Sequence, residues 1–210
     1  MKPVKILPVL LLVFGLGLTD ADGQSWAFGL HFGENISSLT GDQSYEYRLG
    51  FMGGVHVSHY LTENVVMRLE VNMERKGAKG EQTAPEPFPG EAEWGNDYRL
   101  DYLSLPVLLR YSTKGKSKFI AGGGVSVDYL MQEKTDYPQG SIFETANFRR
   151  FDTDLIACMG GSLPLGEKMT FTLEIRGMWG MVKVNKPEGV ARELGRNISW
   201  GLMAGVNYYL

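Results

Sequence analysis

The 210-residue sequence contains a single cysteine, no excess of basic residues and, after Gln24, no uninterrupted apolar run of about 18 residues. One cysteine excludes an intramolecular disulfide framework. The 21 Lys and Arg residues are outnumbered by 24 Asp and Glu residues, so the net charge of −3 offers no electrostatic basis for binding nucleic acid. The absence of a long apolar run excludes a transmembrane helix beyond Gln24.

Glycine, by contrast, is abundant, with 27 residues or about 13% of the chain, nearly twice its average usage of roughly 7%. Hydrophobic residues make up 43% of the sequence and charged residues 21%, which excludes a disordered chain. The mean hydropathy of −0.15 resembles that of a soluble protein. It is also the average expected when every strand of a membrane barrel has one apolar and one polar face.

The first 23 residues have the three parts of a secretory signal peptide. A start that contains two lysines is followed by a largely apolar segment, residues 6–18, and then by the small residues Ala21 and Gly23. The apolar segment has about 13 residues, fewer than the roughly 20 that a spanning helix needs. We therefore expect cleavage after residue 23, export of the chain, and one mature domain of residues 24–210.

The mature chain alternates apolar and polar residues with a period of two, which is typical of β-strands. In residues 65–74, for example, Val65 and Leu69 share one face, while Arg68 and Glu70 share the other. The pattern predicts eight strands, at residues 26–32, 49–61, 65–74, 102–111, 119–131, 151–163, 169–181 and 197–210.

The connections between these strands alternate in length. Long polar connections are expected at residues 33–48, 75–97, 132–147 and 185–196, and short ones at 62–64, 112–118 and 164–168. This asymmetry is typical of outer-membrane barrels, whose extracellular loops are long and whose periplasmic turns are short. We predict an all-β fold: an eight-stranded antiparallel up-and-down transmembrane β-barrel with long extracellular loops and short periplasmic turns.

The residues on the polar face indicate that it lines the lumen. That face combines many glycines with charges of both signs, which suits the narrow interior of an eight-stranded barrel. The apolar face carries aromatic residues near the strand ends, as membrane-interface girdles do. The candidate functional residues form a lumen charge network of Arg68, Glu70, Glu74, Arg110, Asp128, Asp152, Asp154, Glu174 and Arg176.

Three segments resemble the PorT-like outer-membrane β-barrel family of Bacteroidetes. The first is Tyr102-Leu103-Ser104-Leu105-Pro106-Val107-Leu108-Leu109-Arg110-Tyr111, the second is Gly122-Gly123-Gly124-Val125, and the third is the closing segment of residues 201–210. The resemblance implies a barrel in the OmpA/OmpX style, inserted by the outer-membrane assembly machinery through its C-terminal strand. Such strands usually end in Phe, whereas this one ends in Leu210. Because Pro106 cannot donate a hydrogen bond within a sheet, we expect a bulge or locally irregular pairing there.

The sequence gives no catalytic, cofactor or metal site. His59 and Ser58 are neighbours, so in a strand they point to opposite faces and cannot form a dyad. His31 and His56 are expected to point inward from adjacent strands, without the spacing of metal ligands around them. Cys158 is expected to fill space on the inner face.

The function expected is therefore that of a small outer-membrane barrel with a structural or cell-surface interaction role. Its expected partners are outer-membrane lipid, the assembly machinery, and a ligand or protein at the long loops, such as residues 75–97. The competing hypotheses are a narrow pore for small solutes, a soluble periplasmic lipocalin-like ligand barrel, and a lipid-modifying barrel enzyme. The charge network suits either interior packing by paired charges or a path for solutes.

Overall fold

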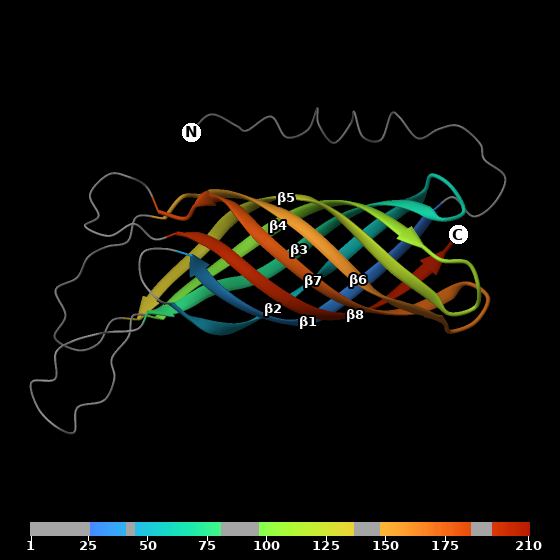
Figure 1. Ribbon diagram of the computed structural model, residues 1–210, viewed down its shortest axis with the longest axis horizontal. Coiled ribbons are helices and arrows are strands. Elements are labelled where there is room, and N and C mark those ends of the chain that lie inside the picture. Colours follow the sequence, from blue (N-terminus) through green and yellow to red (C-terminus); the bar gives the residue numbers. More distant parts are fainter. Residues whose placement is uncertain (1–25, 41–44, 81–96, 137–147, 186–194) are drawn as a thin grey trace, which may run out of the picture.

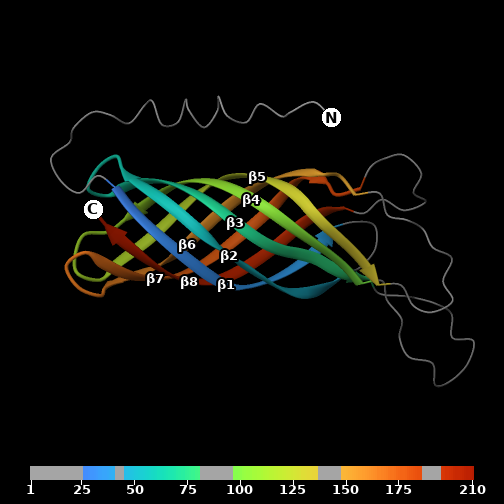
Figure 2. The same ribbon diagram turned by 180° about the vertical axis from the view of Figure 1, so that it is seen from behind.

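The computed structural model describes residues 26–40, 45–80, 97–136, 148–185 and 195–210. These residues form one closed barrel in which each strand is antiparallel to its neighbours in sequence and β1 pairs with β8 (Figures 1 and 2). The predicted eight-stranded fold is confirmed. The strands are β1 (Trp26–Thr40), β2 (Tyr45–Tyr60), β3 (Val65–Gly80), β4 (Asp97–Ser112), β5 (Lys118–Asp136), β6 (Phe151–Pro164), β7 (Met169–Lys183) and β8 (Arg196–Tyr209).

Within the described part of the chain, no helix has the length and apolar character needed to cross a membrane.

The two ends of the barrel differ and are named here for later use. The short-turn end is where residues 61–64, 113–117 and 165–168 connect consecutive strands. The first and last strands meet there, because the amide of Leu210 donates to the carbonyl oxygen of Trp26 over 3.2 Å. The far end is the opposite end, where β1, β3, β5 and β7 finish.

Most strands extend beyond their predicted bounds at the far end, and the predicted long connection at residues 33–48 is wrong. β1 continues to Thr40 and β2 begins at Tyr45, so only residues 41–44 join them. The alternation of long and short connections therefore fails at the first connection. Sequence hides this part of β1 because its inward residues, Asn35 and Ser37, are small and polar, although both are buried.

The barrel is apolar outside and polar inside, as the face assignment predicts. Outward side chains such as Leu30 and Leu49 are 62% and 64% exposed, whereas inward Asn72 and Ser104 are 1% and 0% exposed. A soluble barrel would show the opposite arrangement. Exposed aromatic side chains lie near both ends: Tyr111, Phe119 and Tyr208 toward the short-turn end, and Tyr129, Phe151 and Trp200 nearer the far end.

Buried apolar residues form two small clusters inside the lumen. The larger one gathers at the far end and comprises Leu39, Ala78, Tyr98, Leu100, Tyr102, Leu130, Phe148 and Val184. Its aromatic rings pack edge to face, with 6.1 Å between the centroids of Tyr98 and Phe148. The smaller one comprises Met52, Leu108, Ile156, Met178 and Met203. The far-end cluster therefore buries apolar side chains from β1, β3, β4 and β5 at that end of the barrel.

Inner-face glycines leave room for long lumen side chains. A Cβ atom on Gly122 would lie 3.0 Å from Cγ of Arg110 and 2.9 Å from its Cα. A Cβ atom on Gly201 would lie 2.8 Å from the sulfur of Met52. Both contacts are closer than a Cβ atom tolerates. At Gly122 the nearest atom is the backbone oxygen of Leu109, at 2.6 Å, so the close approach of β4 and the stem of Arg110 leave no room for a side chain there.

Pro106 does not produce the predicted bulge. The register between β3 and β4 is the same on both sides of it, as the pairs of Leu69 with Val107 and of Asn72 with Ser104 show. Pairing is interrupted between these two pairs, which is the irregular pairing expected of a proline. On the other side, Pro106 stays paired with Ser126 of β5. The missing N–H therefore interrupts the pairing of β3 with β4 locally and leaves the register of the two strands unchanged.

The lipid-facing surface can be tested with Ile175, which lies in the middle of β7 and is 54% exposed. Ile175→Arg should lower the free energy of unfolding by about 2–4 kcal/mol, because it places a charge near the middle of the bilayer. Leu165→Arg, in the connection after β6, should cost about 0–1 kcal/mol. Urea unfolding in phospholipid vesicles measures both, and equal costs would contradict the membrane orientation.

Candidate functional site

The structure buries all nine residues of the lumen charge network on the inner face, each with 6% relative exposure or less. They come from five strands: Arg68, Glu70 and Glu74 from β3, Arg110 from β4, Asp128 from β5, Asp152 and Asp154 from β6, and Glu174 and Arg176 from β7. They do not form one network. The contacts divide them into an arginine cluster toward the short-turn end and a lysine cluster toward the far end.

The arginine cluster comprises Arg68, Glu70, Arg110, Glu174 and Arg176. Arg176 is fully buried and donates from both terminal nitrogens to the carboxylate of Glu70, over 2.7 and 2.9 Å. It also donates to Glu174 over 2.8 Å. Arg110 donates to the other oxygen of Glu174. Glu174 therefore joins guanidinium groups from β4 and β7. The pair of Arg176 with Glu70 is bidentate, the geometry that makes such pairs strong.

Arg68 lies at the edge of this cluster and depends on neutral partners. Its nearest carboxylate oxygen, on Glu70, is 4.0 Å away. The guanidinium donates instead to the hydroxyl of Ser58 over 3.1 Å and to the side-chain oxygen of Asn207 over 3.0 Å. The charge of Arg68 is therefore only partly balanced by the residues around it.

The lysine cluster centres on Lys76, which the alternation pattern places in a connection. Lys76 belongs to β3 and is 1% exposed. Its ammonium nitrogen lies 3.2 Å from Glu74 and 2.7 Å from Asp128, and it also donates to Asp154. The pattern ends this strand at Glu74 because a lysine between an arginine and a glycine resembles a polar connection. Continuing the inward parity of Arg68 and Glu74 by one step would have found it.

Asp152 belongs to neither set of ion pairs. Its carboxylate accepts a hydrogen bond of 2.9 Å from the side-chain amide of Asn197. The same side-chain nitrogen also donates to the hydroxyl of Tyr102 over 3.3 Å. Asp152 lies next to the lysine cluster, since its backbone pairs with that of Asp128.

The formal charges are therefore separated along the lumen. In the arginine cluster, three guanidinium groups face two carboxylates. Around Lys76, one ammonium group is paired with the three carboxylates of Glu74, Asp128 and Asp154, and Asp152 adds a fourth carboxylate next to Asp128. The described lumen is positive toward the short-turn end and negative toward the far end.

Two of the three histidines meet inside the lumen, and the third packs on the outer face. His31 and His56 point inward as expected, and their Nδ1 atoms are 3.2 Å apart. Nε2 of His56 contacts Asn207 at 2.8 Å. Across the described ranges, no group of three or more His, Cys, Asp or Glu side chains is arranged to hold a metal ion. Ser58 points inward to Arg68, whereas the ring of His59 packs outside on Trp26, so the two do not form a dyad.

The fold and its polar, charge-filled lumen define a small outer-membrane β-barrel. Residues 21–185 match the family model described as "Outer membrane protein beta-barrel domain". The chain belongs to this family. No curated protein matches its sequence.

Two solved structures share the fold. The outer membrane protein OprG from Pseudomonas aeruginosa is 14% identical, with a TM-score of 0.60 over 91% of this chain and 99% of that one. Neisserial surface protein A is also 14% identical, with a TM-score of 0.53 over 88% of this chain and 97% of that one. At this identity the likeness concerns the barrel architecture alone.

The contribution of the lysine cluster can be measured with two lysines of one strand. Lys76→Met should lower the free energy of unfolding by about 3–5 kcal/mol, because it leaves buried carboxylates without their cation. Lys79→Met is the matched control, since Lys79 is exposed on the outer face of β3. Chemical unfolding of the refolded variants gives both values, and similar losses would show that Lys76 does not hold the cluster together.

Proposed function

We propose that this protein is a closed, non-conducting outer-membrane barrel with a structural or cell-surface interaction role. The observation that carries this proposal is the pair of Arg176 and Glu70. β7 and β3 are four strands apart in either direction around the barrel, so this buried bidentate pair joins opposite walls across the lumen. Arg110 of β4 and Lys76 of β3 also reach carboxylates on strands that are not their neighbours.

These crossing pairs argue against a narrow pore. An open path would require Arg176 to leave Glu70 and Glu174, and separating a buried ion pair costs about 3–5 kcal/mol. An eight-stranded barrel has an interior only wide enough for side chains to fill. Paired charges that fill a narrow lumen are therefore better explained as interior packing than as a solute path.

Conductance in planar lipid bilayers tests the closed lumen. The wild-type protein should show no steady conductance. Arg176→Ala removes the group that joins the two walls and should introduce brief openings, whereas Lys79→Ala should behave as the wild type does. A steady open conductance in the wild type that is lost in Arg176→Ala would show that the arginine lines a path, and would overturn the proposal.

A ligand carrier and a lipid-modifying enzyme both fit the lumen less well than a closed barrel does. A lipocalin-like carrier needs an apolar cavity that holds its ligand, whereas the described lumen is lined largely by charged and polar groups. We favour a non-enzymatic role because Ser58 and His59, the one sequence neighbour pair suited to a lipid-modifying dyad, face opposite sides of the wall.

We further propose that residues 1–23 are a cleaved signal peptide and that residues 24–210 form the barrel domain. Residues 1–25 lie outside the described part of the chain, so this proposal rests on the sequence alone. We also propose relationship to the PorT-like barrels of Bacteroidetes, on the segment at residues 102–111, and insertion by the outer-membrane assembly machinery through β8. Outer-membrane lipid would then contact the apolar outer face.

Cell fractionation together with heat-modifiable migration tests export and insertion. The full chain should be recovered in the outer membrane and should migrate faster in gels when unboiled, because a closed barrel resists unfolding by detergent. A chain that lacks residues 2–23 should stay in the cytoplasm, because nothing directs its export. Recovery of the full chain in the soluble periplasm would contradict the assignment.

Recognition at the long connections is a proposal from the sequence. Residues 81–96 and 137–147 lie outside the described residues, and the described strands β3 and β4 take up the two ends of the segment predicted at 75–97. The composition of residues 81–96, with three prolines and four glutamates, supports exposure on a rigid scaffold, where binding sites are often found.

A further inference from the structure

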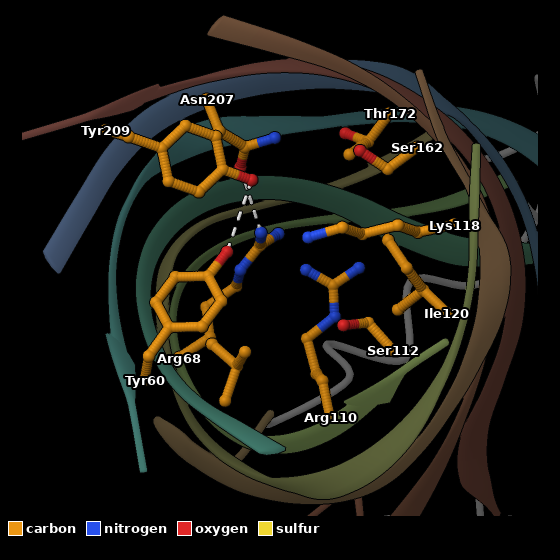
Figure 3. Close-up of a pocket in the computed structure, with 11 residues that line it drawn as sticks. Tyr60, Arg68, Arg110, Ser112, Lys118, Ile120, Ser162, Thr172, Asn207 and Tyr209 are labelled. Carbon is orange, nitrogen blue, oxygen red and sulfur yellow. Dashed lines mark hydrogen bonds between the residues drawn. The ribbon is translucent and has the colours of Figure 1, made fainter. Parts of the chain in front are cut away.

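A pocket opens at the short-turn end of the lumen, where three cationic side chains converge (Figure 3). It has about 380 Å³ of empty space, including the part open to solvent, and none of its eleven lining residues is acidic. The cations are Arg68, Arg110 and Lys118, which come from β3, β4 and β5. These three residues, with the hydroxyl groups described below, are called the basic pocket.

The three cations lack enough partners of opposite charge. In the part of the chain that the structure describes, the ammonium group of Lys118 has no ion-pair or hydrogen-bond partner. Arg110 is 4% exposed and is paired with Glu174 through one terminal nitrogen, but its Nε atom is buried without an acceptor, and Glu174 is shared with Arg176. Arg68 is 4.0 Å from its nearest carboxylate. Figure 3 shows the three cationic groups pointing toward one another at the centre of the pocket. Like charges that converge in this way favour an anion between them.

The remaining lining specifies the kind of anion. Five hydroxyl groups surround the cations, from Tyr60, Ser112, Ser162, Thr172 and Tyr209. Hydroxyl, ammonium and guanidinium groups all donate hydrogen bonds. A phosphate group accepts several hydrogen bonds and carries up to two negative charges, so it fits this lining better than a carboxylate does. We propose that the basic pocket binds the phosphate group of a ligand that enters from water at the short-turn end.

The position of the pocket decides the source of the ligand. The lining side chains belong to the inner face, so the closed wall of eight strands separates them from the bilayer. On the opposite side, buried apolar side chains of the far-end cluster pack together inside the barrel. The carboxylates around Lys76 would also repel an anion that approached from there. Entry is therefore from the aqueous side at the short-turn end.

The proposal is tested by titrating inorganic phosphate into the refolded full chain in nanodiscs of phosphatidylcholine, followed by calorimetry and phosphorus NMR. Wild-type protein should bind at one site, with an affinity that falls as sodium chloride is added. Lys118→Gln should raise the Kd about tenfold, because it removes one charged hydrogen-bond donor. Lys118→Arg should retain binding. Lys118 is half-buried at the mouth of the pocket and has no ion pair to lose, so these variants should fold.

Lys116→Gln is the matched control. It makes the same change of charge two residues away, in the connection that precedes β5, where Lys116 is exposed and does not line the pocket. Its Kd should equal that of the wild type, and heat-modifiable migration should show that all variants are folded. Absence of phosphate binding by the wild type, or equal effects of Lys116→Gln and Lys118→Gln, would overturn the proposal.

A second lipid composition distinguishes a water-borne phosphate from a lipid headgroup. The titration is repeated at high salt in nanodiscs that contain phosphatidylglycerol. A Kd equal to that measured in phosphatidylcholine at the same salt supports a ligand from water. A higher Kd in phosphatidylglycerol would mean that anionic headgroups compete for the pocket, and would overturn that part of the proposal. Phosphate binding and the proposed non-conducting lumen can fail separately, because the pocket does not include Arg176 or Glu70.

Discussion

The structure depends on the constraint that a bilayer offers no hydrogen-bond partner to backbone amide and carbonyl groups. A sheet satisfies all of these groups only when it has no free edge. Here the closing ladder runs the whole length of the first and last strands, from the pair of Ala27 with Tyr209 to the pair of Thr40 with Arg196. In the closed barrel, every second side chain of the eight strands points into one narrow lumen. The residues at these inward positions therefore determine the polarity and the charge of the lumen.

A narrow lumen holds little water, so the charges inside it need partners of opposite sign, which come from the same strand and from other strands of the wall. Arg176 spans the barrel to Glu70 because no acidic side chain on β6 or β8 is paired with it. Glycines on the inner face let neighbouring strands and lumen side chains lie close together, as Gly122 does beside the backbone of β4 and the stem of Arg110. The abundance of glycine and the modest mean hydropathy therefore have the same cause. This barrel is apolar outside and polar inside, which is the opposite of a soluble barrel.

Sequence parity is sufficient to predict the strands and the direction of their side chains, but it is insufficient to predict which charges meet. Glu70 and Arg176 are 106 residues apart, and their contact depends on the stagger between strands, which alternation does not encode. Parity places Lys76 inward, but the alternation pattern ends this strand at Glu74, because a lysine between an arginine and a glycine resembles a polar connection. It misses the far part of β1 because Asn35 and Ser37 are small polar residues, which suit a connection as well as a polar lumen.

The separation of charge along the lumen bears on what the interior can do. Arg68, Arg110 and Lys118 give the short-turn end a positive potential, whereas the carboxylates around Lys76 give the far half a negative one. An anion attracted to the short-turn end is repelled further in, and a cation attracted to the far half is repelled at the short-turn end. A uniform ring of one charge favours conduction. Opposite charges in series oppose the passage of either ion, so this lumen suits binding at one end and closure beyond it.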